Sequence, residues 1–287
     1  MNLSDIQHIA VIGAGVMGRG IALVAARSGY STLLFDINTE MLDTSRQYAE
    51  SFFSKSVTRG KMTEEEKAQA ISRIQYISDP AKVIADVIIE AVPERLDLKH
   101  KVLAPIEAQN GPKTIIASNT STIPITKIAA GLTRPAQVVG MHFFNPAPIM
   151  KLVEVISGEM TDPKVAQLIY DLAVEMGKKA VSAKDEPGFI VNRVARQFYV
   201  ESLKVLEEQV ADHETIDRLM RNHGFRMGPF QLMDLIGIET NHEVTKSMYE
   251  AFFFDEKFRP SRIQQKKVDA GQFGRKTGKG FYEYPQS

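Results

Sequence analysis

The segment Gly13-Ala-Gly-Val-Met-Gly18 has the glycine spacing that lets a backbone bind a pyrophosphate. The first glycine permits a tight turn, the second lets the chain approach the phosphates, and the third allows close packing of a helix on a strand. The N-terminus of the helix that follows would attract the phosphates. Glycine-rich turns have many other uses. Here an apolar run precedes the motif and a helical pattern follows it, which favours a dinucleotide site.

Asp36 follows this motif at close to the spacing, roughly 20 residues, of the acid that accepts a hydrogen bond from the ribose 2′-hydroxyl. Its charge would repel a 2′-phosphate, and Ile37 and Asn38 offer no arginine to receive one. The sequence therefore predicts NAD rather than NADP as the cofactor. The alternative is that Asp36 only caps the helix that follows.

A second candidate for chemistry is the pair His142 and Glu154. His142 ends the apolar run that begins at Val138, and strand alternation places Glu154 on the same face as Leu152. A carboxylate among apolar neighbours is costly unless it is paired. A Glu–His pair fixes the tautomer of the ring and stabilises its protonated form, as a general base for a hydroxyl requires. Spacing alone leaves open that His142 is a hydrogen-bonded core residue.

These residues need an α/β framework to position them. A strand from Ile9, a helix that stops at Gly29 and a strand over 31–36 form a βαβ unit of the expected size. Further strand-like runs begin at Val87, Thr114, Val138 and Leu152. The class is therefore α/β, with an N-terminal Rossmann-type, mostly parallel sheet. Residues 39–75 predict an inserted pair of exposed helices, broken at Arg59-Gly60.

The pattern changes after residue 185. From Val191 onward apolar residues recur at helical spacing, and no strand is expected before Phe281-Tyr-Glu-Tyr. The sequence therefore predicts an NAD-binding domain over residues 1–185 and an all-helical C-terminal domain for substrate binding and dimerisation over 186–287.

Composition excludes several classes of function. Among 287 residues the net charge is +0 and cysteine is absent, so neither a nucleic-acid surface nor thiol chemistry is expected. No HExxH motif occurs and the histidines lack ligand spacing, which predicts no metal. No signal peptide or membrane-spanning run is present, so a cytoplasmic protein that binds neither membrane nor nucleic acid is expected.

Several segments together resemble the 3-hydroxyacyl-CoA dehydrogenase family over nearly the whole chain. They agree with the family in both content and order, which makes them far more specific than the glycine motif alone. The segments are Gly13–Gly18, Ala117-Ser-Asn-Thr-Ser121, Gly140-Met-His-Phe-Phe-Asn-Pro146 with Lys151-Leu-Val-Glu154, Pro187-Gly-Phe-Ile-Val-Asn-Arg193 and Gly274-Arg-Lys-Thr-Gly-Lys-Gly-Phe-Tyr282.

The resemblance implies NAD-dependent oxidation of an L-3-hydroxyacyl-CoA to the 3-ketoacyl-CoA, with His142 as the base and Glu154 as its partner. It makes Ser121 a substrate-binding residue and Asn192 an interdomain residue of the site, although both residue types also cap turns and helices. It further implies a homodimer formed through the C-terminal domain. The residues that it assigns to the cofactor site, beside Gly13, Gly15, Gly18 and Asp36, are Glu94, Lys99 and Asn145.

Lys55 and Arg59, with Lys61 nearby, form a small basic group where the exposed helices break. The family resemblance favours this region for the phosphates of CoA, and a solvated helix face is the alternative.

The acyl group remains open. Segments that begin at Asn192 and Phe258 resemble the branch acting on 3-hydroxyadipyl-CoA in phenylacetate breakdown, and 3-hydroxybutyryl-CoA is the other candidate. Arg193, Arg196 or Arg262 would receive a distal carboxylate, unless they pair with neighbours on their helices. A sugar-acid dehydrogenase on the same scaffold is a further alternative. A non-enzymatic binding protein comes last, because the expected catalytic side chains are all present.

Overall fold

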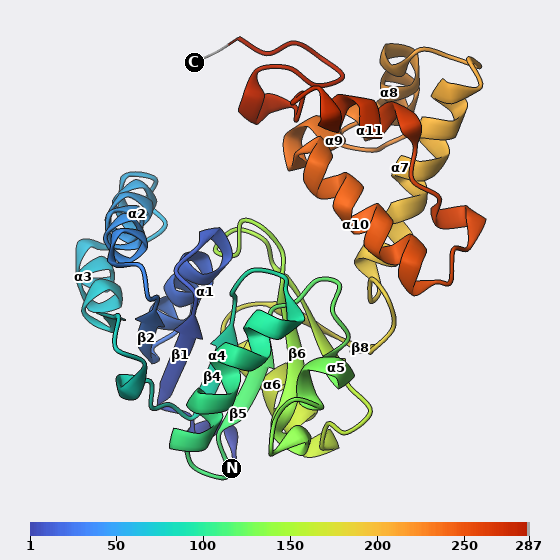
Figure 1. Cartoon of the computed structure of the whole chain (residues 1–287). Coiled ribbons are helices and arrows are strands. Elements are labelled where there is room, and N and C mark those ends of the chain that lie inside the picture. Colours follow the sequence, from blue (N-terminus) through green and yellow to red (C-terminus); the bar gives the residue numbers. More distant parts are fainter. Residues whose placement is uncertain (286–287) are drawn as a thin grey trace. The chain divides into compact units, whose positions relative to one another are not determined.

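The computed structural model of the protein describes residues 1–285, so the last two residues of the predicted second domain lie outside the described part. Two compact units make up the chain, one over Met1–Phe189 and one from Ile190 onward (Figure 1). The first contains an eight-stranded sheet, and the second is helical. The predicted class, an α/β domain followed by a helical domain, is confirmed. The sequence places the boundary near residue 186, and the contacts divide the chain between Phe189 and Ile190.

The sheet has the strand order β3-β2-β1-β4-β5-β6-β7-β8. All neighbouring strands are parallel except β6 and β7, which are antiparallel. The strands are β1 (His8–Ile12), β2 (Ser31–Phe35), β3 (Ile74–Ile77), β4 (Val87–Glu90), β5 (Ile115–Ser118), β6 (Val138–Phe143), β7 (Leu152–Ser157) and β8 (Lys179–Lys184).

Helices cover both faces of the sheet, so successive side chains of an inner strand point into two different apolar clusters. In β1, Ile9 and Val11 belong to the cluster that includes residues of α1, α2 and α6, whereas Ala10 and Ile12 belong to the cluster that includes residues of α4 and α5. Such two-sided burial explains why the central strands read as continuous apolar runs. The helices of this unit are α1 (Val16–Arg27), α2 (Thr39–Thr58), α3 (Glu64–Ser72), α4 (Leu96–Gln109), α5 (Ile125–Ala129) and α6 (Pro163–Glu175).

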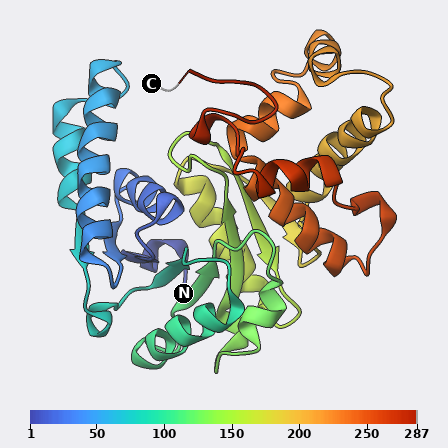
Figure 2. The ribbon, with the colours of Figure 1, turned by 45° about the horizontal axis from the view of Figure 1, so that its top comes forward.

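Helices α2 and α3 lie side by side as a pair beyond the edge of the sheet (Figure 2). Each begins at a capping side chain: Asn38 accepts the backbone N–H of Glu40, and Thr63 forms a capping box with Glu66. The chain between them turns at Gly60, whose φ of 65° is a left-handed conformation that glycine adopts readily.

Strands β3 and β8 were not expected from the sequence. They are the two edge strands, and their residues are mostly half-buried or exposed. An edge strand has a partner on one side only, and polar or charged residues are common there. The segments Ile74-Gln-Tyr-Ile and Lys179-Ala-Val-Ser-Ala-Lys therefore lack the apolar run that identifies the inner strands.

The second unit packs its helices around a separate apolar cluster that includes Leu203, Phe230 and Phe281. The expected strand at Phe281-Tyr-Glu-Tyr is wrong. Only an isolated bridge forms there, because the Asp234 carboxylate accepts the backbone N–H groups of Phe281 and Tyr282, each at 2.9 Å. The helices are α7 (Val191–Glu207), α8 (His213–Asn222), α9 (Pro229–Ile236), α10 (Ile238–Ala251) and α11 (Arg262–Asp269).

Candidate active site

The glycine motif forms the turn between β1 and α1, as its spacing predicts. Gly13 has a φ of 100°, and a Cβ there would lie 2.8 Å from the Ala91 carbonyl oxygen. At Gly18 a Cβ would lie 1.7 Å from the Gly13 carbonyl oxygen, so only glycine lets helix and turn pack this closely. Gly15 precedes the first residue of α1, and a Cβ there would meet nothing within 4 Å. This open space at a helix N-terminus fits a pyrophosphate.

The Asp36 carboxylate lies beside this turn. Its Oδ2 accepts the backbone N–H of Ala14 at 2.7 Å, and its Oδ1 accepts that of Asn38 at 2.9 Å. The cap of α2 is Asn38, so the alternative interpretation of Asp36 as the helix cap is wrong. A half-buried carboxylate fixed next to the glycine turn is placed to accept ribose hydroxyls and to oppose a 2′-phosphate.

We expect NAD to be used at least ~10²-fold more efficiently than NADP, because opposing like charges costs several kcal/mol. Asp36→Ala should narrow this gap. Asp43→Ala, which removes an exposed carboxylate from α2, is the matched control and should leave it unchanged. The comparison is kcat/KM for the two cofactors, and equal values in the wild-type protein would contradict the assignment.

His142 and Glu154 are direct partners across the antiparallel strands β6 and β7. The Nδ1 atom of His142 lies 2.8 Å from Oε2 of Glu154, and both side chains are buried. The expected pairing of the two residues is therefore found. An ionised carboxylate only accepts hydrogen bonds, so in the neutral imidazole Nδ1 carries the proton and Nε2 presents a lone pair. Phe144 and Phe189 lie near the imidazole, with ring centroids 4.6 and 5.8 Å away.

Ser121 lies in the loop after β5, and the Glu94 carboxylate organises this loop. Oε1 of Glu94 accepts the backbone N–H groups of Ser121 and Thr122 at 2.8 and 2.9 Å, and the hydroxyl of Thr120 at 2.6 Å. Burial by itself raises the pKa of Glu94. The Lys99 ammonium and the hydrogen bonds from Thr120, Thr122 and Ser121 outweigh burial and lower the pKa to about 2. Glu94 therefore stays ionised and holds the loop.

Lys99 is buried between two carboxylates. Its Nζ lies 2.7 and 2.9 Å from the two oxygens of Glu90 and 3.1 Å from Oε2 of Glu94. Glu90 also accepts the hydroxyl of Ser118 at 2.5 Å, so the two acids fix opposite ends of the Ser121 loop. Sequence reasoning missed Glu90. The signal was a carboxylate at the end of the buried run Val87-Ile-Ile-Glu, which demands a partner as Glu154 does.

Asn145 is exposed in the segment that follows β6, two residues beyond the end of that strand. The sequence did not predict a role for Asn119, whose Oδ1 accepts the backbone N–H of Phe143 at 2.8 Å and so ties the Ser121 loop to the end of β6. Lys55 and Arg59 are exposed at the C-terminal end of α2, on the helix pair rather than on the sheet that carries His142.

The remaining predicted residues belong to the helical unit. Asn192 is the second residue of α7, and Arg193 beside it stacks over the ring of Phe252 at 4.9 Å. Arg196, one turn further along the helix, is 3% exposed. Its Nη1 donates to the Asn241 carbonyl oxygen and to the Thr245 hydroxyl, at 3.1 and 3.0 Å.

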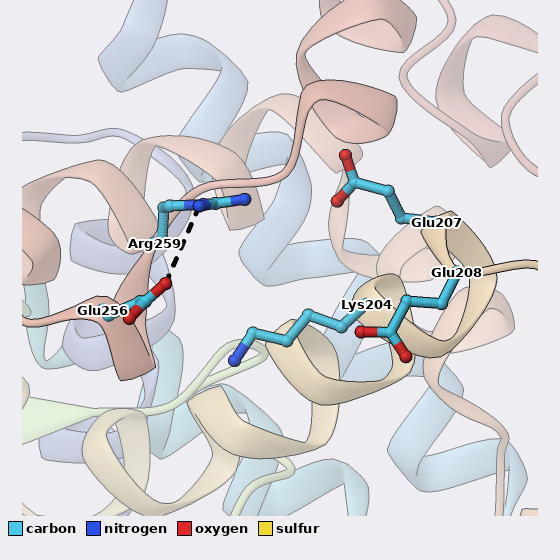
Figure 3. A pocket seen from close by; sticks show the side chains of 5 residues that line it. All are labelled: Lys204, Glu207, Glu208, Glu256 and Arg259. Carbon is cyan, nitrogen blue, oxygen red and sulfur yellow. Dashed lines mark ion pairs between the residues drawn. The ribbon is translucent and has the colours of Figure 1, made fainter.

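A pocket in this unit lies between the end of α7 and the short helix Glu256–Phe258. Figure 3 shows side chains from both segments facing one hollow, with Arg259 and Glu256 paired at 3.8 Å. Lys204, Glu207 and Glu208 complete the lining. The lining contains three carboxylates and only two cationic side chains, so this pocket is a poor site for a negatively charged phosphate. An adjoining pocket includes Arg262 together with Glu207. Neither contains a residue that the sequence assigns to the cofactor or to catalysis.

Fold and site together define a class: a dinucleotide-binding α/β domain with a buried His–Glu pair, followed by a helical domain. The family model for the NAD-binding domain of 3-hydroxyacyl-CoA dehydrogenase matches residues 8–186, and that for its C-terminal domain matches residues 188–284. The chain therefore belongs to the 3-hydroxyacyl-CoA dehydrogenase family, and its cofactor is NAD. The resemblance stated from the sequence is confirmed.

Relatives and solved structures agree with this assignment. A 3-hydroxyadipyl-CoA dehydrogenase of Escherichia coli is 45% identical over 98% of this chain, which spans 59% of that relative's length. A probable 3-hydroxybutyryl-CoA dehydrogenase of Bacillus subtilis is 40% identical over 98% of this chain and 99% of its own. The crystal structure of (S)-3-hydroxybutyryl-CoA dehydrogenase from Ralstonia eutropha has a TM-score of 0.94 and 38% identity, covering 98% of this chain and 100% of its own.

Over residues 1–285, the structure contains no helix with the length and apolar character that crossing a bilayer requires.

Proposed function

We propose that this protein oxidises L-3-hydroxyacyl-CoA thioesters to 3-ketoacyl-CoA with NAD as the hydride acceptor. The observation that carries the proposal is the buried His142–Glu154 pair, on the same sheet as the Gly13–Gly18 turn and Asp36. In the neutral ring, Nε2 of this buried imidazole carries a lone pair, and a nitrogen of this kind is suited to remove a hydroxyl proton. The similarity to dehydrogenases that act on 3-hydroxyacyl-CoA supplies the substrate class.

In the proposed reaction, the hydrogen on C3 leaves as hydride and the hydroxyl proton goes to Nε2 of His142, so that the C3–O bond becomes a carbonyl. NAD, when bound, supplies the hydride acceptor. Glu154 keeps the imidazole in the required tautomer and offsets its charge once it is protonated. The burial of both side chains strengthens this electrostatic effect.

Other residues have binding roles in this proposal. Ser121, presented by the Glu94-bound loop, and Asn192 would hold the reacting oxygens. Glu94, Lys99 and Asn145 would line the cofactor site together with the glycine turn. Lys55 and Arg59 would meet the phosphates of CoA, because both are exposed cations at the end of one helix.

A second candidate is a substrate with a distal carboxylate, and Arg196 favours it. No carboxylate of the described residues lies within ion-pair distance of Arg196, and its Nε is buried without a hydrogen-bond partner. Burial lowers the pKa of Arg196 to about 10, an effect that Tyr199 only partly opposes. A buried guanidinium without an acid suits a carboxylate ligand. Arg193 is exposed and therefore solvated, and Arg262 shares its pocket with Glu207, so both fit this role less well.

A panel of thioesters tests both candidates. We expect NADH formation with L-3-hydroxybutyryl-CoA, L-3-hydroxyhexanoyl-CoA and L-3-hydroxyadipyl-CoA, and none with the free hydroxy acids. No turnover with any thioester would contradict the proposed function.

The carboxylate candidate makes a sharper prediction for Arg196→Met. A hydrogen-bonded charge is worth ~1.5–3 kcal/mol, so kcat/KM for the adipyl thioester should fall roughly 10- to 150-fold. The hexanoyl thioester has the same chain length and should be affected much less. Arg193→Met is the control. An equal fall in kcat/KM for both thioesters would contradict the carboxylate-binding role. Arg196 would then serve only to link α7 to α10.

We also propose a homodimer formed through the helical unit. Several large apolar side chains of that unit are exposed, among them Phe253 at 92% and Val194 at 70%. Light scattering should give twice the mass of one chain, and the mass of a single chain would contradict the proposal.

A further inference from the structure

The segment 144–151 joins β6 to β7 and thereby connects the strands that carry His142 and Glu154. It packs against α1, the helix of the dinucleotide turn. A Cβ at Gly20 would lie 3.1 Å from Cδ of Pro148 and 3.2 Å from Cβ of Ala147. The connecting segment therefore lies against the helix that is expected to bind the pyrophosphate.

The same segment is also held by Lys178. Nζ of this lysine donates to the carbonyl oxygens of Ala147 and Met150, at 2.5 and 2.9 Å. Lys178 lies in the turn between α6 and β8, where Gly177 has a φ of 72° and the backbone N–H of Lys178 donates to the Ala173 carbonyl. The backbone of the lysine is thus fixed, and its buried side chain reaches the segment from a rigid base.

Within residues 1–285, the charge of Lys178 is not balanced by an acidic side chain. Among the described residues no carboxylate lies within ion-pair distance of its ammonium group, and its partners are neutral carbonyl oxygens. Burial, and then the nearby Arg27, lower the pKa of Lys178 to about 8. Burying a cation without a counter-charge is costly for folding, and an apolar side chain of similar length would fit such a site at less cost. We therefore look for the role of Lys178 in the segment 144–151, to which its ammonium group is hydrogen-bonded.

We propose that Lys178 is a positioning residue of the dehydrogenase site. Its ammonium group fixes the segment 144–151 against α1, and so sets the position of Asn145 relative to the dinucleotide turn and to the His142–Glu154 pair. The inference rests on the proposed function, because it assigns Asn145 to the cofactor site. It concerns how that site is built.

The test compares Lys178→Met with Lys179→Met. Lys179 is the next residue, with an exposed side chain, and serves as the matched control. We expect the dissociation constant of NAD, measured by calorimetry, to rise roughly tenfold or more in the first variant, as for loss of a charge-assisted hydrogen bond. Its kcat should fall while KM for the acyl-CoA stays unchanged. Its Tm should change little, because the loss of two hydrogen bonds to carbonyl oxygens is offset by the removal of a buried charge that has no counter-charge.

Three outcomes would overturn the inference: an unchanged NAD dissociation constant, a parallel loss of Tm and of both substrate affinities, or an equal effect of the Lys179 control. If Lys178→Met does not fold, Lys178→Gln, which keeps a donor but no charge, should show an intermediate loss of NAD affinity. A wild-type value in that variant would also contradict the proposal. Because NAD titration needs no thioester, absence of turnover in the wild-type protein would refute the proposed function and still leave Lys178 testable.

Discussion

Substitution of His142 by glutamine should lower kcat for an L-3-hydroxyacyl-CoA by roughly 10²- to 10⁴-fold, the usual contribution of a general base. Glutamine has a similar size and can still donate to Glu154, but it cannot accept a proton at neutral pH. The dissociation constant of NAD should remain close to that of the wild-type protein, because the glycine turn and Asp36 are untouched. Initial rates of NADH formation and an independent NAD titration measure the two effects.

The control for this prediction is His8→Gln, which changes an exposed histidine at the start of β1. It should have wild-type kinetics. Near-normal turnover in His142→Gln would exclude this histidine as the base. A large loss of NAD affinity in that variant would instead indicate that His142 maintains the cofactor site.

Substitution of Glu154 by glutamine should lower kcat by roughly 10²-fold to a few 10³-fold. The imidazolium formed during the reaction would be buried without its counter-charge, which costs about 3–5 kcal/mol. The amide can also rotate to accept the Nδ1 proton, so the ring keeps its place while the electrostatic support is lost. We expect little change in KM and a different pH–rate profile.

Glu159→Gln, an exposed carboxyl just beyond the end of β7, is the matched control. Because His142 and Glu154 act as one unit, the double variant His142→Gln/Glu154→Gln should be scarcely slower than His142→Gln alone. Additive losses would mean that Glu154 contributes by another route. Wild-type turnover in Glu154→Gln would exclude any catalytic role for the pair's carboxylate.

The inner part of the fold follows from the sequence for a physical reason. Strands such as Val87–Glu90 are covered on both faces, so every residue is apolar or paired, and the run is visible without a structure. The edge strands Ile74–Ile77 and Lys179–Lys184 were not predicted from the sequence. Their outer sides contact no other strand of the sheet, so these strands need no apolar pattern. At the other end of the chain, Phe281-Tyr-Glu-Tyr has the composition of a strand, but Asp234 takes up its N–H groups instead.

The site was predictable only in part. Alternation places Glu154 on a buried face, which demands a partner, but the register that sets it opposite His142 depends on how the segment 144–151 turns. That turn is held by Lys178 and packs against Gly20, neither of which is near it in sequence. Similarly, the role of Glu90 emerges only when β4, β5 and α4 bring it to Lys99 and Ser118.

The most direct test of the proposed reaction follows the transferred hydrogen. An L-3-hydroxyacyl-CoA that carries deuterium on C3 should be incubated with NAD and the enzyme, and the reduced cofactor analysed by mass spectrometry. Hydride transfer predicts one deuterium on C4 of the nicotinamide for each 3-ketoacyl-CoA formed. Formation of the ketone without deuterium in the cofactor, or no reduced cofactor at all, would contradict the account.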